Sequence, residues 1–210
     1  PAGMQAAIVL AERGFRPILF ERRAYLGGSA VLASKAPCKG LVAEYIETQK
    51  NQLAALGVQV ELNHAPTMAE LRRLDPYGVF VTMGGQQIVP DIPGIDRENV
   101  FGIEDVLLGR RAIEGREVAV IGGGHVGLEV AHFLCANNKV AIVEMADEIG
   151  ASVYYITKFK LLPLLREAGV TFRTGQAIAA VDDGSIRLRD THTGQCTELK
   201  AEAVVLAMGS

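Results

Sequence analysis

The chain has 210 residues, of which 49% are hydrophobic, and its 21 basic and 24 acidic residues leave a net charge of -3. This composition is too apolar for a disordered chain and too balanced in charge for a general affinity for nucleic acid, and no apolar run approaches the roughly 18 residues of a membrane span. There is no secretory signal pattern, and three widely spaced cysteines form neither a disulfide framework nor a metal pair, so we expect a reducing cytoplasmic setting without nucleic-acid or membrane partners.

The first half of the chain alternates between predicted helices and strands. Apolar spacing and turn residues predict, in chain order, a helix over residues 4–10, a strand over 17–20, a helix over 41–56, a strand over 58–62, a helix over 68–74 and a strand over 78–82. This alternation favours parallel strands whose faces are covered by helices.

A second series of elements follows the proline-rich turn VPDIPG at residues 89–94. We expect a strand over 118–121, a helix over 126–136, a strand over 139–143, a helix over 157–168, strands over 170–173, 177–181, 185–189 and 196–199, and a last strand over 203–208. The short strands between 177 and 199 are separated by turn residues, which predicts an antiparallel meander.

Two stretches of the chain share one order of features, which indicates an internal repeat. Gly3 precedes Glu21, and Gly127 precedes Glu144 at nearly the same separation. In each stretch a helix leads to a strand that closes on an acid, as in nucleotide-binding units. We therefore expect an α/β fold of two Rossmann-like dinucleotide-binding units, the first truncated, with a small antiparallel β meander in the second.

The second unit contains a complete G-x-G-x-x-G motif between a predicted strand and a predicted helix. Gly122 permits the tight turn, Gly124 leaves room for a pyrophosphate, and Gly127 lets the helix approach the strand. The amides of the first helical turn, including those of His125 and Val126, would face the anion. The alternative is a glycine turn that only connects two elements.

Two acids complete this candidate site. Glu144, at the end of the next strand, would accept the ribose hydroxyls of an adenosine, and its charge favours NADH over NADPH; the alternative is a solvated acid. Glu129, one turn into the helix, is the candidate catalytic residue, since it would point toward the nicotinamide or the flavin. Alternatively, it complements the helix dipole.

Several motifs occur in the order of a known family: Pro1-Ala2-Gly3, Phe20-Glu21-Arg22, Leu26-Gly27-Gly28, Ile92-Pro93-Gly94, the glycine loop, and Val205-Leu206-Ala207-Met208-Gly209. The chain resembles the FAD/NAD(P)-binding region of the two-dinucleotide-binding-domain flavoproteins over essentially its whole length. Within them it most resembles the Old Yellow Enzyme-like NADH:flavin oxidoreductases, the group of 2,4-dienoyl-CoA reductase, enoate reductase and trimethylamine dehydrogenase. Residues 33–37 with Lys39, and residues 105–109, resemble that group in particular.

The resemblance implies a partial FAD-binding domain over residues 1–105 and an NAD(H)-binding domain over 106–210 that ends in the return strand to the FAD domain. The implied FAD-site residues are Gly3, Glu21, Arg22, Gly27, Gly28, Gly84 and Gly209. The family's Ala-Thr-Gly motif is replaced by Thr82-Met83-Gly84 and again by Ala207-Met208-Gly209, which places a thioether near the expected flavin.

The resemblance also implies a function, electron input to a larger flavoenzyme. Hydride would pass from NADH to FAD, and electrons would continue through an iron–sulfur cluster to FMN in a barrel domain outside this chain. The expected partners are the remainder of the parent polypeptide and a homo-oligomer, and we expect this piece alone to be inactive and to hold FAD weakly. The alternatives are a non-catalytic ADP-binding module and a stand-alone ferredoxin- or rubredoxin-type reductase.

The remaining polar motifs suggest little further chemistry. Cys38 has no second cysteine nearby, which argues against a thiol–disulfide mechanism and leaves an ordinary thiol or a sulfenate. His125 and His132 are too far apart to ligate one metal ion. Arg110, Arg111 and Arg116 are expected to be a solvated cluster.

Overall fold

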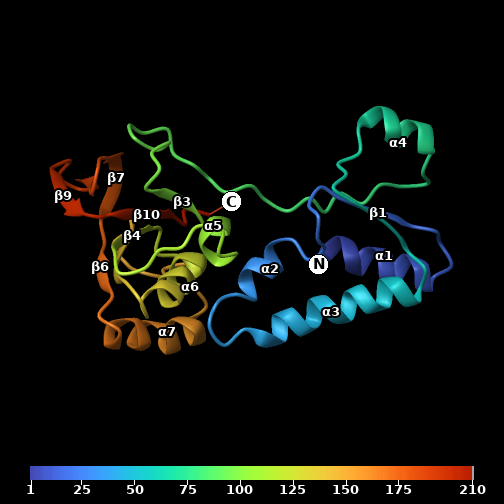
Figure 1. Ribbon diagram of the computed structural model, residues 1–210, viewed down its shortest axis with the longest axis horizontal. Helices are drawn as coiled ribbons and strands as arrows, with labels where there is room; N and C mark the ends of the chain where they lie inside the picture. The colour runs from blue at the N-terminus through green and yellow to red at the C-terminus, as the bar shows by residue number, and fades with distance from the viewer. Residues whose placement is uncertain (210) are drawn as a thin grey trace. The chain divides into compact units, whose positions relative to one another are not determined.

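The computed structural model describes residues 1–209, which divide into two compact units (Figure 1). The first unit comprises Pro1–Gly85, and the second begins at Gln86. Each unit has its own hydrophobic core. The expected α/β fold of two such units, with a small antiparallel meander in the second, is confirmed.

The first unit combines four helices with a two-stranded parallel sheet. In chain order its elements are α1 (Ala2–Glu12), β1 (Ile18–Glu21), α2 (Ser29–Ala33), α3 (Gly40–Ala55), β2 (Gln59–Leu62) and α4 (Met68–Leu74). Ile18 lies opposite Gln59 in the sheet. Met4 and Ile8 of α1 pack with Ile46 and Leu53 of α3, so the expected amphipathic faces of these helices form the core.

The prediction of a strand over residues 78–82 is wrong. These residues adopt no regular structure, and the side chains of Val79, Phe80 and Val81 are exposed. The β-branched and aromatic residues fit a pleated surface, but a strand also needs a neighbouring backbone with which to pair. The two-stranded sheet of the first unit does not extend to this segment.

The second unit is built on a five-stranded parallel sheet in the order β3-β10-β4-β5-β6, beside a three-stranded antiparallel sheet in the order β7-β8-β9. In chain order its elements are β3 (Val100–Gly102), α5 (Ile103–Leu107), β4 (Glu117–Ile121), α6 (His125–Leu134), β5 (Lys139–Val143), α7 (Tyr155–Glu167), β6 (Thr171–Arg173), β7 (Gln176–Val181), β8 (Ser185–Asp190), β9 (Cys196–Lys200) and β10 (Ala203–Leu206). The elements expected from residue 118 onward are confirmed, whereas β3 and α5 were not expected.

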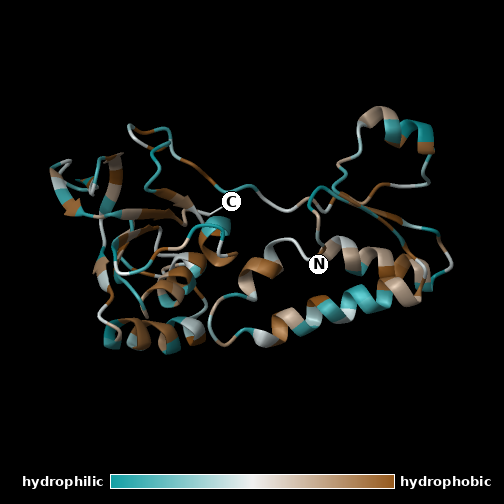
Figure 2. Cartoon of the chain, in the orientation of Figure 1, coloured by the Kyte–Doolittle hydropathy of each residue, from teal (hydrophilic) through white to brown (hydrophobic). Residues whose placement is uncertain are grey.

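The strand β4 is the centre of the parallel sheet. Its Val118 lies opposite Ala203 of β10 on one side and Val140 of β5 on the other. Ala119 and Val120 are completely buried, as expected for a strand whose two faces are both covered. Figure 2 shows hydrophobic residues along these central strands, and a mixture of hydrophilic and hydrophobic residues along α7.

The boundary expected between residues 105 and 106 differs from the division of the structure. Residues 86–105 belong to the compact second unit because β3 pairs with β10. The Ile88 amide also donates to the Gly209 carbonyl (2.9 Å), and the Gln87 side chain donates to the Leu206 carbonyl (2.8 Å). No sequence pattern predicts this packing, because β3 has only three residues.

Candidate dinucleotide-binding site

The glycine loop leaves the carboxyl end of β4, where the parallel sheet meets α6. The Gly122 amide donates to the Val143 carbonyl of β5 (2.8 Å), and the φ of Gly122 is 110°, in the region that favours glycine. A Cβ at Gly122 would lie 2.4 Å from the Ala207 carbonyl oxygen. The turn therefore requires glycine both for its conformation and for its close approach to the end of β10.

Gly127 lies where α6 crosses this turn. A Cβ at Gly127 would lie 1.8 Å from the Gly122 carbonyl oxygen, so no side chain fits between the helix and the loop. The next residues of α6, from Leu128 to Ala131, are all buried. The third glycine of the motif thus sets the packing of the helix on the sheet, as the spacing of the motif predicts.

Gly124 has different surroundings from the other two motif glycines. It is the N-cap of α6, with a φ of -75°, and a Cβ placed on it would meet no atom within 4 Å. No side chain caps this helix terminus. The first amides of α6, those of His125 and Val126 among them, have no carbonyl partner within the helix, and they share this end with the positive pole of the helix dipole. This open helix start fits a pyrophosphate.

The Glu144 carboxylate lies beside the same loop, at the end of β5. One of its oxygens accepts a hydrogen bond from the Gly123 amide (2.7 Å), and the other accepts one from the Ala146 amide (2.8 Å). A carboxylate has about four lone-pair positions, so two amide donors leave it able to accept two further hydroxyl groups. The side chain is half-buried and fixed in place, which suits an acceptor for the two hydroxyls of a ribose.

Glu129 is paired with His125 on α6. The His125 Nε2 atom lies 2.6 Å from Glu129 Oε1, and the exposed fractions of the two side chains are 46% and 11%. The pair connects a buried carboxylate to the first turn of the helix, next to the open position at Gly124. The predictions that Glu129 serves catalysis and that His125 and Val126 contact the cofactor are untested by this geometry.

The first unit has a related arrangement at the end of β1. Glu21 Oε1 accepts a hydrogen bond from the Arg23 amide (2.9 Å), as Glu144 does from Ala146, while Arg22 is exposed. A Cβ at Gly3 would lie 2.7 Å from Thr82 Oγ1, so α1 passes close to the segment before Met83. These features fit the adenosine end of a dinucleotide, and their role in holding FAD stays a prediction.

The glycines of the other FAD motifs adopt conformations with positive φ. Gly27 and Gly28 have φ values of 114° and 50°, and Gly28 is the N-cap of α2. Gly84 in the first unit and Gly209 in the second have φ values of 69° and 97°. Met83 is exposed in the first unit, whereas Met208 packs against the core of the second. Of these two methionines, Met208 therefore contributes to the packing of its unit, and Met83 does not.

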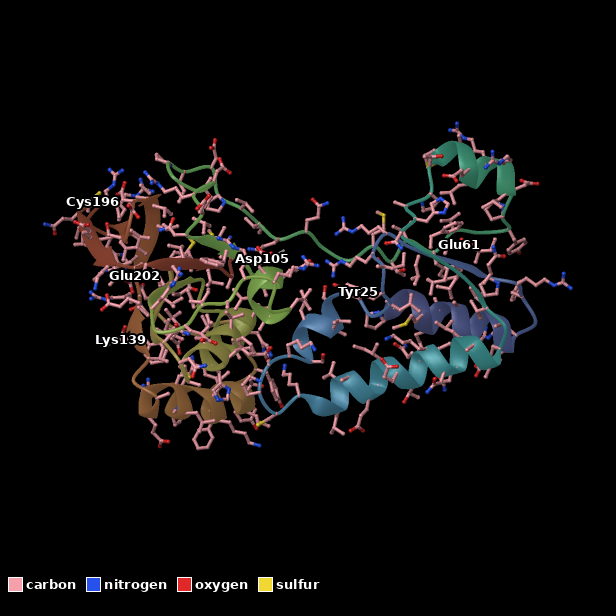
Figure 3. All side chains as sticks on the ribbon, in the orientation of Figure 1. Tyr25, Glu61, Asp105, Lys139, Cys196 and Glu202 are labelled. Atoms are coloured by element: carbon pink, nitrogen blue, oxygen red, sulfur yellow. The ribbon has the colours of Figure 1, made fainter. Side chains whose placement is uncertain are left out.

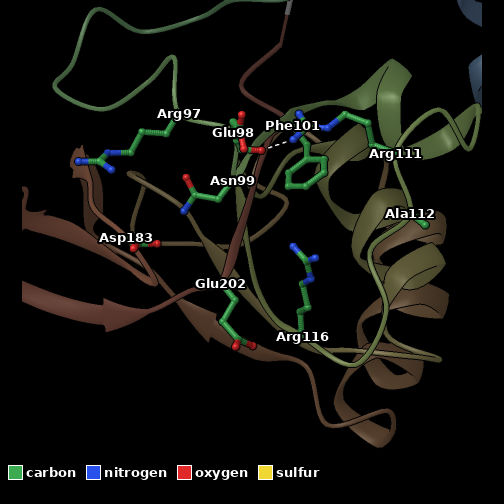
Figure 4. A pocket seen from close by; sticks show the side chains of 9 residues that line it. All are labelled: Arg97, Glu98, Asn99, Phe101, Arg111, Ala112, Arg116, Asp183 and Glu202. Atoms are coloured by element: carbon green, nitrogen blue, oxygen red, sulfur yellow. Dashed lines mark hydrogen bonds between the residues drawn. The ribbon is translucent and has the colours of Figure 1, made fainter.

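A pocket of roughly 630 Å³ lies in the second unit at the amino edge of the parallel sheet (Figure 4). Its lining mixes Arg97, Arg111 and Arg116 with Glu98, Asp183 and Glu202. Figure 3 shows Glu202 and Lys139 at this same edge, at the starts of β10 and β5. The glycine loop lies at the opposite, carboxyl edge. This pocket is therefore separate from the candidate dinucleotide site.

The expectation that Arg110, Arg111 and Arg116 form a solvated cluster is wrong for Arg111. Its guanidinium lies 3.9 Å from the centre of the Phe101 ring, donates to the Val100 carbonyl (2.9 Å) and also contacts the Glu98 carbonyl. Arg110 is exposed and lies 3.5 Å from Glu104. Only one of the two adjacent arginines is therefore a structural residue, and sequence alone does not distinguish them.

The cysteines and histidines form no recognisable metal or redox centre in the described residues. The three cysteines are free: Cys38 and Cys196 are exposed, and burial raises the pKa of the Cys135 thiol, which disfavours its reactive thiolate form. No group of three or more possible metal ligands occurs between residues 1 and 209. Over the same residues, every helix is too short or too polar to cross a membrane.

Sequence reasoning missed a contact between the Glu144 loop and the meander. His192 Nε2 lies 2.5 Å from Asp147 Oδ1, and the neighbouring Thr191 reaches the same loop. The two partners are 45 residues apart in sequence. No local pattern could have predicted this pair, because it depends on how the turn between β8 and β9 folds onto the loop after β5.

Comparison with known proteins gives one family and a consistent set of relatives. The family model described as pyridine nucleotide-disulphide oxidoreductase matches residues 1–210. The whole chain is 34% identical to an NADH oxidase of Thermoanaerobacter brockii, and covers 33% of that protein. It is 30% identical to a bilirubin reductase of Mediterraneibacter gnavus, again over its whole length, and covers 32% of that protein.

A solved structure of 2-naphthoyl-CoA reductase, in complex with 2-naphthoyl-CoA, matches the fold with a TM-score of 0.88 and 26% sequence identity. That match covers all of this chain and 32% of the reductase. The chain thus spans about a third of the length of the relatives it matches.

Proposed function

This chain belongs to the pyridine nucleotide-disulphide oxidoreductase family, and from that premise we propose that its second unit binds NADH while its first unit holds the adenosine end of FAD. As a member of this family it is an NAD(P)H-dependent flavoprotein oxidoreductase, with FAD and NADH as its cofactors. When bound, NADH supplies a hydride and FAD accepts it.

The observation that carries the proposal is the pairing of an open helix start with a prearranged carboxylate. Gly124 leaves space beside the unpaired amides of α6, and the Glu144 carboxylate is fixed next to Gly123 with acceptor capacity to spare. A pyrophosphate fits the first feature and a ribose with two free hydroxyls fits the second. An extra 2′-phosphate would meet the charge of Glu144, which favours NADH.

Three residues have proposed roles in orienting the nucleotide. Gly124 admits the pyrophosphate, Glu144 accepts hydrogen bonds from the adenosine ribose, and Glu129, held by His125, directs the nicotinamide end. Glu129 is the proposed catalytic residue of this chain because it is the buried acid next to the loop.

For the whole protein we propose that this region supplies electrons to a separate reductase domain. The relatives named as a bilirubin reductase and a 2-naphthoyl-CoA reductase are about three times the length of this chain, which leaves room for further domains. In the resembled group those domains carry FMN and an iron–sulfur cluster, and electrons would pass from FAD through them to an unsaturated substrate.

The test is a comparison of NADH and NADPH affinities in the wild type and in Glu144→Ala. We expect the wild type to prefer NADH, and the variant to bind NADH about tenfold more weakly while its discrimination against NADPH narrows, since a charged hydrogen-bond acceptor is lost. Glu148→Ala, in the same loop but paired with Lys158, is the matched control and should behave as the wild type. Equal affinities in the wild type would refute the role of Glu144, and permanently retained ADP would favour the non-catalytic module.

A further inference from the structure

The turn between β8 and β9 folds over the loop that carries Glu144. This turn, residues 190–193, is held in shape by Asp190, whose carboxylate accepts hydrogen bonds from the amides of His192 (3.0 Å) and Thr193 (2.7 Å). Its amides are thus fixed by a side chain within the turn, so the two residues at its tip, Thr191 and His192, have defined positions.

Thr191 contacts the Glu144 loop through uncharged groups. Its amide donates to the Gly175 carbonyl (2.8 Å), and its hydroxyl lies 3.1 Å from the same carbonyl and 3.4 Å from that of Met145. The Gly175 amide in turn donates to the Ala146 carbonyl (2.9 Å). Thr191 is therefore connected to both residues that directly follow Glu144.

His192 contacts the same loop through charge. Its Nε2 atom lies 2.5 Å from Oδ1 of Asp147, and both side chains are exposed, at 64% and 73%. Asp147 comes directly after Ala146, whose amide holds the Glu144 carboxylate. The order along the loop is thus ribose acceptor, its amide donor, and the partner of His192.

We propose that Thr191 and His192 act as a clasp that positions the Glu144 loop for the adenosine ribose, so that nucleotide affinity depends on the protonation of His192. The two halves of the clasp differ in chemistry: the Thr191 half is independent of pH, and the Asp147–His192 half is an ion pair only while the imidazole is protonated. This inference rests on the proposed function, because it takes Glu144 to be the ribose acceptor.

The charges around His192 set the direction of the effect. The hydrogen bond and the charge of Asp147, together with the more distant charge of Asp190, raise the pKa of His192 above its ordinary value of 6.5. The pair is therefore intact below that value and is lost as the pH rises through the raised pKa. Glu144 and Glu148 are the other acids of the loop, and Glu148 is paired with Lys158. Nucleotide affinity should fall as the pH rises.

The probe for the test is ADP-ribose, which contains the adenosine ribose and the pyrophosphate and is stable in acid. Its affinity for the full chain would be measured by calorimetry from about pH 5.5 to about pH 8.5, a range that brackets the ordinary histidine pKa. We expect the wild type to bind about two- to fivefold more weakly at the upper end, since exposed ion pairs contribute little.

Two variants separate the halves of the clasp. His192→Asn should remove this pH dependence and bind weakly throughout, whereas Thr191→Val should weaken binding at every pH and keep the pH dependence. His64→Asn is the matched control, because His64 forms a similar pair with Glu70 (3.1 Å) in the first unit and should leave the profile unchanged. Amide hydrogen exchange of residues 144–148 should accelerate in both clasp variants, which reports loop order without any nucleotide.

The outcomes distinguish this inference from the proposed function. If Glu144→Ala leaves ADP-ribose affinity unchanged, the proposed function fails, but faster exchange in His192→Asn would still show that the clasp orders the loop. If Glu144→Ala weakens binding while His192→Asn retains the pH profile of the wild type, the clasp is overturned. Unchanged loop exchange in both clasp variants also overturns it.

Discussion

A Cβ on Gly127 would lie 1.8 Å from the carbonyl oxygen of Gly122, which means that the first and third glycines of the motif are in backbone contact. The contact fixes the distance between α6 and the turn after β4. It also separates the glycines by role, because Gly127 is needed for the fold while Gly124 is needed only for space. That separation can be tested with single methyl groups.

Gly127→Ala should destabilise the second unit by about 3 kcal/mol, since the added carbon must displace backbone rather than a flexible side chain. The measurement is chemical denaturation followed by circular dichroism. Gly124→Ala is the matched control, because its Cβ would meet no atom within 4 Å and its φ of -75° suits alanine. Gly124→Ala should therefore keep the stability of the wild type but bind NADH more weakly, because its methyl group would occupy the space proposed for the pyrophosphate. Equal stability of the two variants would contradict the assigned roles.

Glu129→Gln should slow flavin reduction by about tenfold or more while changing NADH affinity little, because the amide keeps the shape of the side chain but loses its charge-assisted contact with His125. The measurement is the rate of flavin bleaching in stopped-flow experiments on the whole protein with FAD bound, since this chain alone is expected to hold FAD weakly. Glu167→Gln, at the exposed end of α7, serves as the control. A normal rate in Glu129→Gln would leave Glu129 as a structural partner of His125 only.

Arg111→Met should destabilise the second unit by about 2 kcal/mol, through loss of the contact with the Phe101 ring and of hydrogen bonds to the Val100 and Glu98 carbonyls. Arg110→Met removes the same charge one residue earlier, where the side chain is exposed, and should change stability by less than about 0.5 kcal/mol. Thermal unfolding of the two variants checks the difference, and similar melting temperatures would contradict it.

Thr67→Ala should loosen α4 in the first unit at a cost of about 1 kcal/mol, because the hydroxyl caps the Glu70 amide (3.2 Å). The Glu70 carboxylate in turn accepts a hydrogen bond from the Thr67 amide (2.8 Å), and this bond, ahead of weaker effects, lowers the pKa of Glu70. The carboxylate therefore contributes its stabilisation above about pH 4.5 and loses it as the pH falls through the lowered pKa. Hydrogen exchange of α4 at falling pH measures the loss, and exchange that does not change with pH would contradict it.

The predictable parts of the fold were those with a local physical cause. The helix predicted over residues 68–74 matches α4 to the residue, and in the structure Thr67 and Glu70 form a capping box at its start. The glycine loop identified the junction of β4 with α6. The turns between the short strands likewise identified the meander. In each of these elements, the residues that determine the structure lie within a few positions of one another.

The unpredicted parts depend on contacts between distant segments. The strand β3 exists because β10, a hundred residues later, provides its hydrogen-bond partners. The run over residues 78–82 has strand-like residues but no such partner in the sheet of its unit. The contact of His192 with Asp147 also arises only when the meander folds back. Sequence periodicity cannot report any of these.

The contacts of Gln87 bear on whether the second unit could be exchanged between related proteins. Its side chain donates to the Leu206 carbonyl and accepts from the Ile103 amide (3.2 Å), while the Ile88 amide donates to the Gly209 carbonyl, so the first residues of the second unit lie beside the end of β10. A segment whose two ends meet can be exchanged between proteins as a cassette, since its removal leaves a gap that a short peptide can bridge. Joining Ile88 directly to Leu206 would thus delete the parallel sheet and the meander together, and a related cassette with a different nucleotide preference could replace them at the same two points.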